Sequence, residues 1–230
     1  EAVKGKKVSL RVYGQSEMKK KGFGGVLAVG QGSKEESQFL ILEYKGGSTK
    51  EKPVVLVGKG VTFDTGGIDT KPHPYGLDMM MDMSGGAAVI STLLIAEELK
   101  LKKNLVALIP AVENMPGGES FRPGDVIKML GGVHVEIGHT DAEGRLILAD
   151  AITYAKKWKP DIIIDVATLT GAASVALGER ATALFTKDDE LAEKTLVASE
   201  EVGDYAWRMP LWAEYEGEIA GTVGDISNIR

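Results

Sequence analysis

Two stretches of the sequence concentrate side chains that could perform chemistry. The first, residues 57–82, combines Lys59, Asp64, Lys71 and Asp82 with several glycines. The second, residues 139–145, reads His-Thr-Asp-Ala-Glu-Gly-Arg. Glycine near charged groups is typical of backbone that approaches a ligand closely or turns at positive φ. Lysines facing acidic residues could equally form only a solvated loop, so the rest of the sequence must distinguish these two interpretations.

Asp141 and Glu143 lie where a helix is expected to begin. Thr140 and Glu143 have the spacing of a capping box, and acidic side chains suit a helix N-terminus, so a purely structural interpretation is as good as a functional one. If these acids instead lie beside Asp64 and Asp82, four carboxylates would repel one another unless cations neutralise them. Two divalent ions about 3.5–4 Å apart would do so and form a known hydrolytic arrangement.

The composition limits the classes of protein. With 230 residues, 43% of them hydrophobic, the chain is long enough for one large domain or two small ones. Cysteine is absent, which excludes disulfides, zinc–thiolate sites and cysteine nucleophiles. The net charge of -6 argues weakly against a nucleic-acid surface. No apolar run approaches the roughly 20 residues of a membrane span, so no membrane partner is expected.

Several common catalytic patterns are missing. The three histidines do not form H-E-x-x-H, which argues against a thermolysin-like zinc site. No G-x-S-x-G occurs, so a serine hydrolase with a nucleophile elbow is not expected. The glycine-rich residues 22–33 fit neither G-x-G-x-x-G nor the Walker pattern, and a phosphate-binding loop is therefore a poor interpretation.

Apolar strands that alternate with helices frame the two stretches. We expect strands at residues 38–44, 54–57, 104–112, 161–167 and 181–185, a hairpin at 125–137, and helices at 16–21, 84–100, 145–158 and 188–203. The helix at 84–100 is apolar nearly all round and is expected to be buried. This alternation predicts an α/β fold with a mostly parallel central sheet and helices on both faces, a three-layer sandwich.

The polar loops follow the expected strands. Lys59 comes directly after the strand at 54–57, Asn114 follows the strand at 104–112, and Thr168 follows the strand at 161–167. Ligands bind at the carboxyl ends of the strands in such sheets. The order of the elements therefore predicts a site at one edge of the sheet, whatever the motifs mean.

Three motifs resemble the signatures of the leucyl aminopeptidase family, the M17 dizinc cytosol aminopeptidases. They are VGKGVTFDTGG at 57–67, DMSGGAA at 82–88 and TDAEGRL at 140–146. The likeness runs from about residue 22 to the end and includes ENMP at 113–116, ATLTG at 167–171 and WRMPL at 207–211. Several long motifs in the same order make the resemblance highly specific.

The resemblance implies a catalytic domain with two divalent metal ions, zinc or manganese, with magnesium or cobalt as further candidates for one site. By resemblance, Asp64 and Glu143 bridge the ions, Asp141 completes one metal site, and Lys59 with Asp82 forms the other. Lysine binds metal only as the neutral amine, so the pKa of Lys59 would have to be lowered by burial and by the cations. The alternative for Lys59 is a salt bridge to Asp64 or Asp82.

The family also implies a mechanism, that of a metal-dependent aminopeptidase. Lys71 is expected to stay charged and to stabilise the oxyanion that develops on the scissile carbonyl. Arg145 is expected to hold a bicarbonate that acts as general base toward a metal-bridging water, the nucleophile. The free α-amine of the substrate would bind the metal held by Lys59 and Asp82, which restricts hydrolysis to the N-terminal peptide bond, preferably after leucine or a similar apolar residue.

The resemblance also implies a substrate pocket. Met79, Thr168 and Gly171 match its lining, although Met79 could be an ordinary core methionine. His139 stands where the family usually has asparagine. Both side chains can donate a hydrogen bond to substrate backbone, but a histidine can also gain a proton in mild acid, so we expect an unusual pH response. Other acidic residues match no ligand position and are expected to have surface or capping roles: Asp69, Asp78 and Asp150.

Family members carry a separate N-terminal domain and a longer catalytic domain. We therefore expect residues 1–230 to be a single catalytic metallopeptidase domain, truncated at its C-terminus and lacking that N-terminal domain. The family implies peptide substrates, a homo-hexamer and a cytoplasmic location. The alternative is a non-catalytic structural or DNA-binding member, which the retained ligand residues disfavour. A two-metal phosphoesterase lacks the expected histidine ligands.

Overall fold

The computed structural model describes residues 3, 7–74 and 76–230. The chain divides into two compact units, a main unit of residues 1–168 and 221–230 and a second unit of residues 169–220. The expectation of a single catalytic domain stays a prediction, and each unit is described by itself below.

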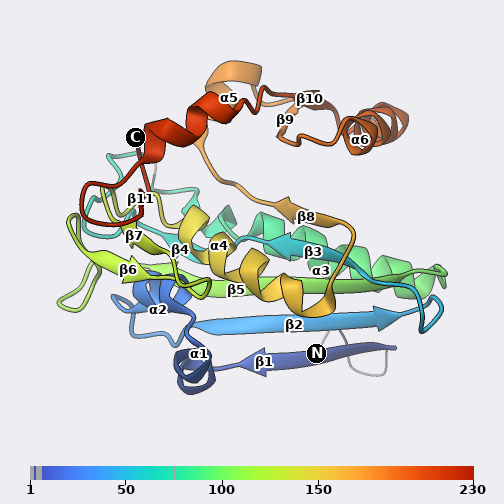
Figure 1. The fold of residues 1–230 in the computed structure, drawn as a ribbon, viewed down its shortest axis with the longest axis horizontal. Coiled ribbons are helices and arrows are strands. Elements are labelled where there is room, and N and C mark those ends of the chain that lie inside the picture. Colours follow the sequence, from blue (N-terminus) through green and yellow to red (C-terminus); the bar gives the residue numbers. More distant parts are fainter. Residues whose placement is uncertain (1–2, 4–6, 75) are drawn as a thin grey trace. The chain divides into compact units, whose positions relative to one another are not determined.

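The main unit is built on a six-stranded sheet (Figure 1). Its strands are, in spatial order, β1 (Val8–Tyr13), β2 (Gln38–Lys45), β5 (Asn104–Asn114), β3 (Val54–Gly58) and β8 (Ile163–Val166), with β4 (Gly60–Asp64) also paired to β5. The pairings of β5 with β3 and β4, and of β3 with β8, are parallel. The pairings β1–β2 and β2–β5 are antiparallel. The fold is α/β as expected, but the sheet is mixed: its parallel part carries the candidate site, and its outer part is antiparallel.

Helices pack on both faces of this sheet. On one face, Val89 and Leu93 of α3 (Ser84–Glu98) lie in a buried cluster with residues of β2, β3 and β5. The other face is covered by three helices, α1 (Gln15–Lys21), α2 (Gly24–Gly30) and α4 (Gly144–Ala155). Figure 1 shows α4 in front of the sheet and α3 behind it.

Gly85 lets the first turn of α3 approach the strands very closely. A Cβ atom at Gly85 would lie 2.0 Å from the carbonyl oxygen of Val166 in β8. A Cβ atom at Gly58, in β3, would lie 2.6 Å from the carbonyl oxygen of Gly85. Since no larger residue fits between these backbones, the glycines fix where α3 begins, and Asp82 lies just before that point.

Several elements of the main unit were not expected from the sequence, among them β1, β4 and α2. β1 lies in a segment that we interpreted as polar and basic, and β4 in a segment that we interpreted as a loop. Helix α2 has the sequence GGVLAVG, whose glycines disfavour a helix. The glycines are there for packing: a Cβ at Gly24 would lie 1.9 Å from Lys128 O, and one at Gly25 would lie 2.6 Å from Leu146 O.

The expectation that α3 is buried nearly all round is wrong. Ala88 and Ile95 are exposed, whereas Val89, Leu93 and Ala96 are buried in the core. The helical residues Met79–Glu98 are also long and apolar enough to cross a membrane by length and composition alone, contrary to our expectation. The same property is found in core helices of globular proteins, and α3 packs against the sheet in that way.

The remaining elements of the main unit form a small sheet. β6 (Val126–Lys128) and β7 (His134–Glu136) make the expected hairpin, and β11 (Ile226–Ser227) pairs with β7 in parallel. The carboxylate of Glu136 accepts hydrogen bonds from the backbone N–H groups of Thr222 and Val223, both at 2.9 Å. These bonds attach the end of the chain to the hairpin.

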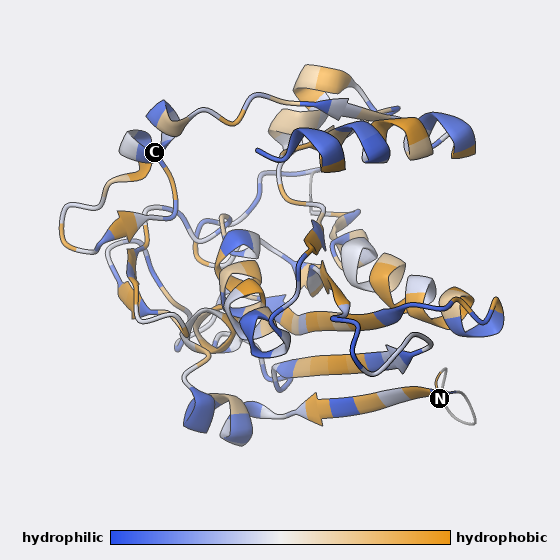
Figure 2. Ribbon diagram, turned by 45° about the vertical axis from the view of Figure 1, so that its right-hand side comes forward, coloured by the Kyte–Doolittle hydropathy of each residue, from blue (hydrophilic) through white to orange (hydrophobic). Residues whose placement is uncertain are grey.

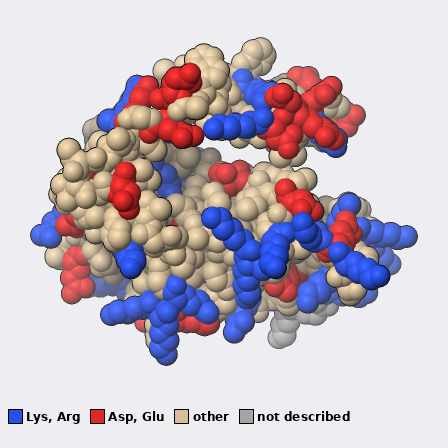
Figure 3. Space-filling view, in the orientation of Figure 1, with Lys and Arg blue, Asp and Glu red and all other residues tan. Residues whose placement is uncertain are grey.

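The second unit contains α5 (Gly171–Leu177), β9 (Thr182–Leu184), α6 (Asp189–Val202), β10 (Ala206–Arg208) and a 3-10 helix, Ala213–Ile219. β9 and β10 pair in parallel, and the expected strand and helix at 181–185 and 188–203 are present. α6 is amphipathic, with alternating hydrophilic and hydrophobic colour in Figure 2. Figure 3 shows acidic side chains gathered over α6. Acidic charge on this surface agrees with the expectation of no nucleic-acid partner, which stays a prediction.

Candidate metal centre

Lys59 occupies a one-residue break between β3 and β4. The two strands run one after the other along β5, which pairs first with β3 and then with β4. At the break, the N–H of Lys59 donates to Val166 O of β8 at 3.0 Å, and the carbonyl of Lys59 accepts from Gly86 N–H of α3 at 2.7 Å. The backbone is thus fixed from both sides, and the side chain of Lys59 is only 3% exposed.

The ammonium group of Lys59 contacts two buried carboxylates. Its Nζ lies 2.8 Å from Asp82 Oδ2 and 2.8 Å from Glu143 Oε1, and it donates to Thr168 O at 3.0 Å. Asp82 follows the 3-10 turn Met79–Met81 and also accepts a hydrogen bond from Thr168 Oγ1 at 2.6 Å. The salt bridge to Asp82 is the alternative that the sequence left open for Lys59.

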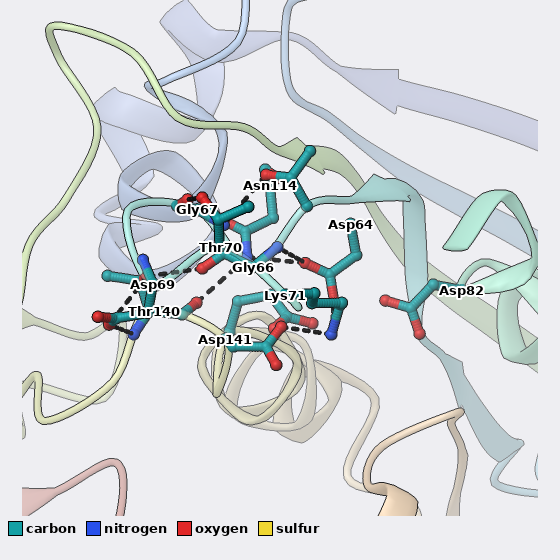
Figure 4. Close-up of polar contacts among 12 residues, drawn as sticks. Asp64, Gly66, Gly67, Asp69, Thr70, Lys71, Asp82, Asn114, Thr140 and Asp141 are labelled. Carbon is teal, nitrogen blue, oxygen red and sulfur yellow. Dashed lines mark hydrogen bonds and ion pairs between the residues drawn. The ribbon is translucent and has the colours of Figure 1, made fainter. Parts of the chain in front are cut away.

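Lys71 forms a second, more accessible arrangement of the same type (Figure 4). Its Nζ lies 2.9 Å from Asp64 Oδ2 and also pairs with Asp141 Oδ1. Gly66 has a φ of +91°, so the chain turns sharply after β4, and the Lys71 N–H donates to Thr65 O at 2.8 Å. The turn returns Lys71 to Asp64, the residue at the end of β4.

Burial opposes charge at both lysines of this cluster and at three of its carboxylates, Asp82, Asp141 and Glu143. Desolvation alone would lower the pKa of Lys59, but Glu143 and Asp82 outweigh it and the pKa is raised. The same balance between burial and two carboxylates raises the pKa of Lys71. Desolvation raises the pKa of Glu143 to about 7, and it also raises the pKa values of Asp82 and Asp141 although lysines lie nearby. Additional positive charge would therefore stabilise the ionised carboxylates.

The acidic residues fit a divalent metal ion. One carboxylate oxygen from each of Asp64, Asp141 and Glu143 lies within 4.8 Å of the other two. Asp82 Oδ2 and Glu143 Oε1 are buried and, among the described residues, have no hydrogen bond of acceptable geometry, although each lies 2.8 Å from Lys59 Nζ. Buried carboxylate oxygens with unused acceptor capacity are suitable ligands for a cation.

The structure describes three further residues that we expected at the site. Met79 is half-buried and begins the turn before Asp82. Arg145 is exposed in the first turn of α4. Gly171 begins α5 in the second unit and is described only within that unit. Their roles at the site stay predictions.

His139 is exposed and lies at the edge of the cluster. Its Nδ1 accepts a hydrogen bond from the backbone N–H of Asp141 at 3.1 Å and lies 3.7 Å from Asp69 Oδ2. The ring therefore contacts the loop that carries Asp141. Its expected contact with substrate stays a prediction.

The sequence analysis missed the residues that connect the two chemical stretches. Asp69, for which we expected a surface or capping role, accepts a hydrogen bond from Thr140 N–H at 2.8 Å through Oδ2. Thr140 Oγ1 donates to Gly66 O at 2.6 Å and accepts from Asp69 N–H at 2.9 Å. Asn114 donates to both stretches. The position of Asn114 at the end of an expected strand was the one available signal, and Asp69 gave none.

The α/β fold and the cluster of carboxylates and lysines together are typical of a protein that binds divalent metal ions. An α/β domain gathers four carboxylates and two lysines near the carboxyl ends of parallel strands, and its donor set suits divalent cations. The sequence profile of the cytosol aminopeptidase family, catalytic domain, matches residues 1–230. The chain therefore belongs to the M17 cytosol aminopeptidase family.

Individual relatives agree with this assignment. The chain is 47% identical over 224 residues to a probable cytosol aminopeptidase of Nitrosococcus oceani, covering 97% of this chain and 45% of the relative. The structure of leucyl aminopeptidase from Trypanosoma brucei in complex with bestatin matches with a TM-score of 0.95 and 34% identity, over 99% of this chain and 44% of the other. The bottromycin maturation enzyme BotP in complex with Mn matches with a TM-score of 0.92 and 40% identity, over 99% of this chain and 50% of the other. The chain thus spans about half the length of the relatives that it matches.

Proposed function

We propose that the protein is a dimetal aminopeptidase that hydrolyses the N-terminal peptide bond of peptides and prefers leucine or a similar apolar residue. The observation that carries this proposal is the cluster of carboxylates around two lysines, three of whose carboxylates lie close enough together to share a cation. Membership of the family supports it, and so do the manganese complex of BotP and the bestatin complex of the trypanosomal enzyme.

Five residues would hold the two ions: Lys59, Asp64, Asp82, Asp141 and Glu143. When bound, zinc or manganese ions would lower the pKa of a bound water and polarise the scissile carbonyl. Lys59 has a raised pKa in its ion pairs and would have to release its proton to act as a ligand. A metal ion would then supply the positive charge that the ammonium of Lys59 supplies without metal. The carboxylates would favour this replacement, because burial raises the free energy of their charged form and a nearby cation lowers it.

Lys71 and Arg145 would act on the substrate. The raised pKa of Lys71 keeps its amine protonated, the form that stabilises negative charge on the carbonyl oxygen of the scissile bond. Arg145 is exposed, and a planar guanidinium can bind bicarbonate through two parallel hydrogen bonds. Bicarbonate held there is proposed as the general base. Met79, His139, Thr168 and Gly171 are proposed to contact the substrate.

We propose a cytoplasmic location because the relatives are named cytosol aminopeptidases. A homo-hexamer is proposed from the family alone, because the structure contains a single chain.

Hydrolysis of leucine p-nitroanilide with added Mn²⁺ or Zn²⁺ tests the proposal. The protein should release nitroaniline only with metal, and Asp82→Ala should lower the rate at least about 100-fold, since even loss of a residue that supports a ligand costs 10–100-fold. Asp78→Ala is the matched control: Asp78 is exposed, and the variant should stay within about 3-fold of the original rate.

Absence of metal-dependent release from the unmodified protein would overturn the proposal. Metal binding without hydrolysis would favour the non-catalytic alternative.

A further inference from the structure

Asn114 joins the two stretches that carry the candidate metal ligands. It is the last residue of β5 and is fully buried. Its Nδ2 donates to Asp64 Oδ1 at 2.9 Å and to the backbone carbonyl of Thr140 at 3.1 Å (Figure 4). Asp64 ends β4, and Thr140 directly precedes Asp141. One amide group therefore contacts both sides of the acidic cluster.

The bond from Asn114 also fixes the orientation of Asp64. Asp64 Oδ1 accepts from Asn114 Nδ2 and from Gly66 N–H, both at 2.9 Å. Asp64 Oδ2 is thereby directed toward Lys71, at 2.9 Å. Oδ1 of Asp64 therefore accepts hydrogen bonds from the surrounding protein, and Oδ2 faces the other charged groups of the cluster.

The backbone of Asn114 reinforces the same turn. Its carbonyl accepts from Thr65 N–H at 3.0 Å and from Thr65 Oγ1 at 2.8 Å. The two stretches are also joined by the bonds of Thr140 to Asp69 and Gly66 described above. Asn114 adds a further connection, and among these it is the one that directly contacts the carboxylate of Asp64.

The residue type at this position is restricted by its surroundings. Both neighbours of Nδ2 are acceptors, so an aspartate here would place a further acceptor against two others. The amide oxygen of Asn114 is buried and has no hydrogen-bond partner among the described residues. Such a group costs about 1–3 kcal/mol. This cost calls for an explanation, and the two donated bonds to the acidic cluster offer one.

We propose that Asn114 is a positioning residue that holds Asp64 and the loop of Asp141 and Glu143 at the separation that metal binding requires. The inference rests on the proposed metal site. Its physical basis is that ligating carboxylates are oriented by hydrogen bonds from surrounding groups, whose loss costs about 10–100-fold in metal affinity.

Asn104, at the opposite end of β5, provides a matched control. Its Nδ2 donates to Ser48 O at 2.7 Å and Glu51 O at 2.9 Å, and its Oδ1 accepts from Gly47 N–H at 3.1 Å. Both asparagines therefore make side-chain hydrogen bonds from an end of the same strand, Asn104 to the single segment 47–51 and Asn114 to two segments of the acidic cluster.

The test measures Mn²⁺ affinity by titration calorimetry and, separately, the free energy of unfolding in EDTA. Asn114→Ala and Asn114→Leu should weaken Mn²⁺ binding about 10–100-fold. Asn104→Ala should leave Mn²⁺ affinity within about 3-fold, although it also removes side-chain hydrogen bonds and lowers stability. The leucine variant keeps the branching and the number of side-chain heavy atoms of asparagine and removes the unpaired oxygen, so the two variants fail in different ways if either fails to fold.

Unchanged Mn²⁺ affinity in the Asn114 variants, or an equal loss in Asn104→Ala, would overturn the inference while leaving the proposed function intact. If both Asn114 variants fail to fold while Asn104→Ala folds, the role of Asn114 is structural only and the inference is also overturned. If the unmodified protein binds no Mn²⁺ or Zn²⁺, the proposed function itself fails.

Discussion

Glu143 and Asp150 are two buried carboxylates about two turns apart, the first at the N-cap of helix α4 and the second within it. They are 1% and 0% exposed, and burial raises the pKa of Glu143 to about 7 and that of Asp150 to about 6. Their partners differ. Glu143 faces the ammonium of Lys59, whereas Asp150 accepts backbone N–H groups from Val26 at 3.0 Å and Leu130 at 2.8 Å.

The difference shows that burial and a raised pKa do not by themselves identify a carboxylate as a metal ligand or catalytic residue. Both oxygens of Asp150 are occupied by backbone donors, so this residue connects α4 to α2 and to the hairpin region. Glu143 instead faces the ammonium of Lys59 and lies beside other carboxylates. The partners of the carboxylate, rather than its burial, distinguish the candidate ligand from the structural residue.

The largest expected effect concerns the counter-charge of Glu143. Lys59→Met keeps the length of the side chain but leaves Glu143 and Asp82 buried without a cation. Breaking a buried ion pair costs about 3–5 kcal/mol, so the free energy of unfolding should fall by that amount in urea denaturation at pH 8 with EDTA.

Lys103→Met is the control for burial. Lys103 Nζ lies 2.8 Å from Glu51 Oε1, the same separation as in the Lys59 pairs, but the side chain of Lys103 is 64% exposed. An exposed pair contributes up to about 1 kcal/mol. Equal losses in the two variants would contradict the conclusion that burial makes the pairs of Lys59 stronger.

The second largest expected effect is on Mn²⁺ affinity, which should distinguish a substitution of Glu143 from one of Asp150. Glu143→Gln should weaken Mn²⁺ binding more than about 100-fold, because a direct ligand is lost rather than a supporting group. Asp150→Asn should change the affinity less than about 3-fold, since its partners are backbone groups away from the cluster. Titration calorimetry checks both. Comparable losses would mean that Asp150 also supports the metal site.

The sequence predicted most of the fold because its periodicity is local. The strands at 38–44, 54–57 and 104–112 and the helices at 84–100 and 145–158 are confirmed within a few residues. β4 and α2 were missed because glycine was interpreted as a turn signal. In the structure, the glycines of α2 permit close packing, which depends on contacts with Lys128 and Leu146, distant in sequence.

The sequence predicted the candidate ligands of the site but not the residues that connect them, and the reason is similar. Motifs nominated the candidate ligands, and the structure gathers Lys59, Asp82 and Glu143 within ion-pair distance. The connecting residues depend on pairings between distant segments, such as Asp69 with Thr140 and Asp64 with Asn114. Sequence position alone cannot predict those partners. Asp150 was likewise set aside because nothing near it in sequence shows which N–H groups it accepts.

The smallest expected effect tests the structural carboxylate through pH. Between about pH 4, where an unfolded aspartate loses its proton, and about pH 6, folded Asp150 keeps a proton that the unfolded chain has lost. The folded state then binds more protons, so the free energy of unfolding falls as pH rises through this window. A shift of about two pKa units corresponds to at most about 3 kcal/mol.

Asp150→Asn removes this titration and also leaves one N–H facing an amide N–H₂ group, because asparagine offers one acceptor oxygen where two donors meet. The variant should be less stable than the original protein by about 1–3 kcal/mol at pH 4–5. The gap should shrink toward pH 7, because only the original protein loses stability as Asp150 ionises. Urea unfolding at several pH values measures it. A gap that does not change with pH would mean that the backbone donors hold Asp150 ionised in the folded protein throughout, and that its hydrogen bonds outweigh its burial.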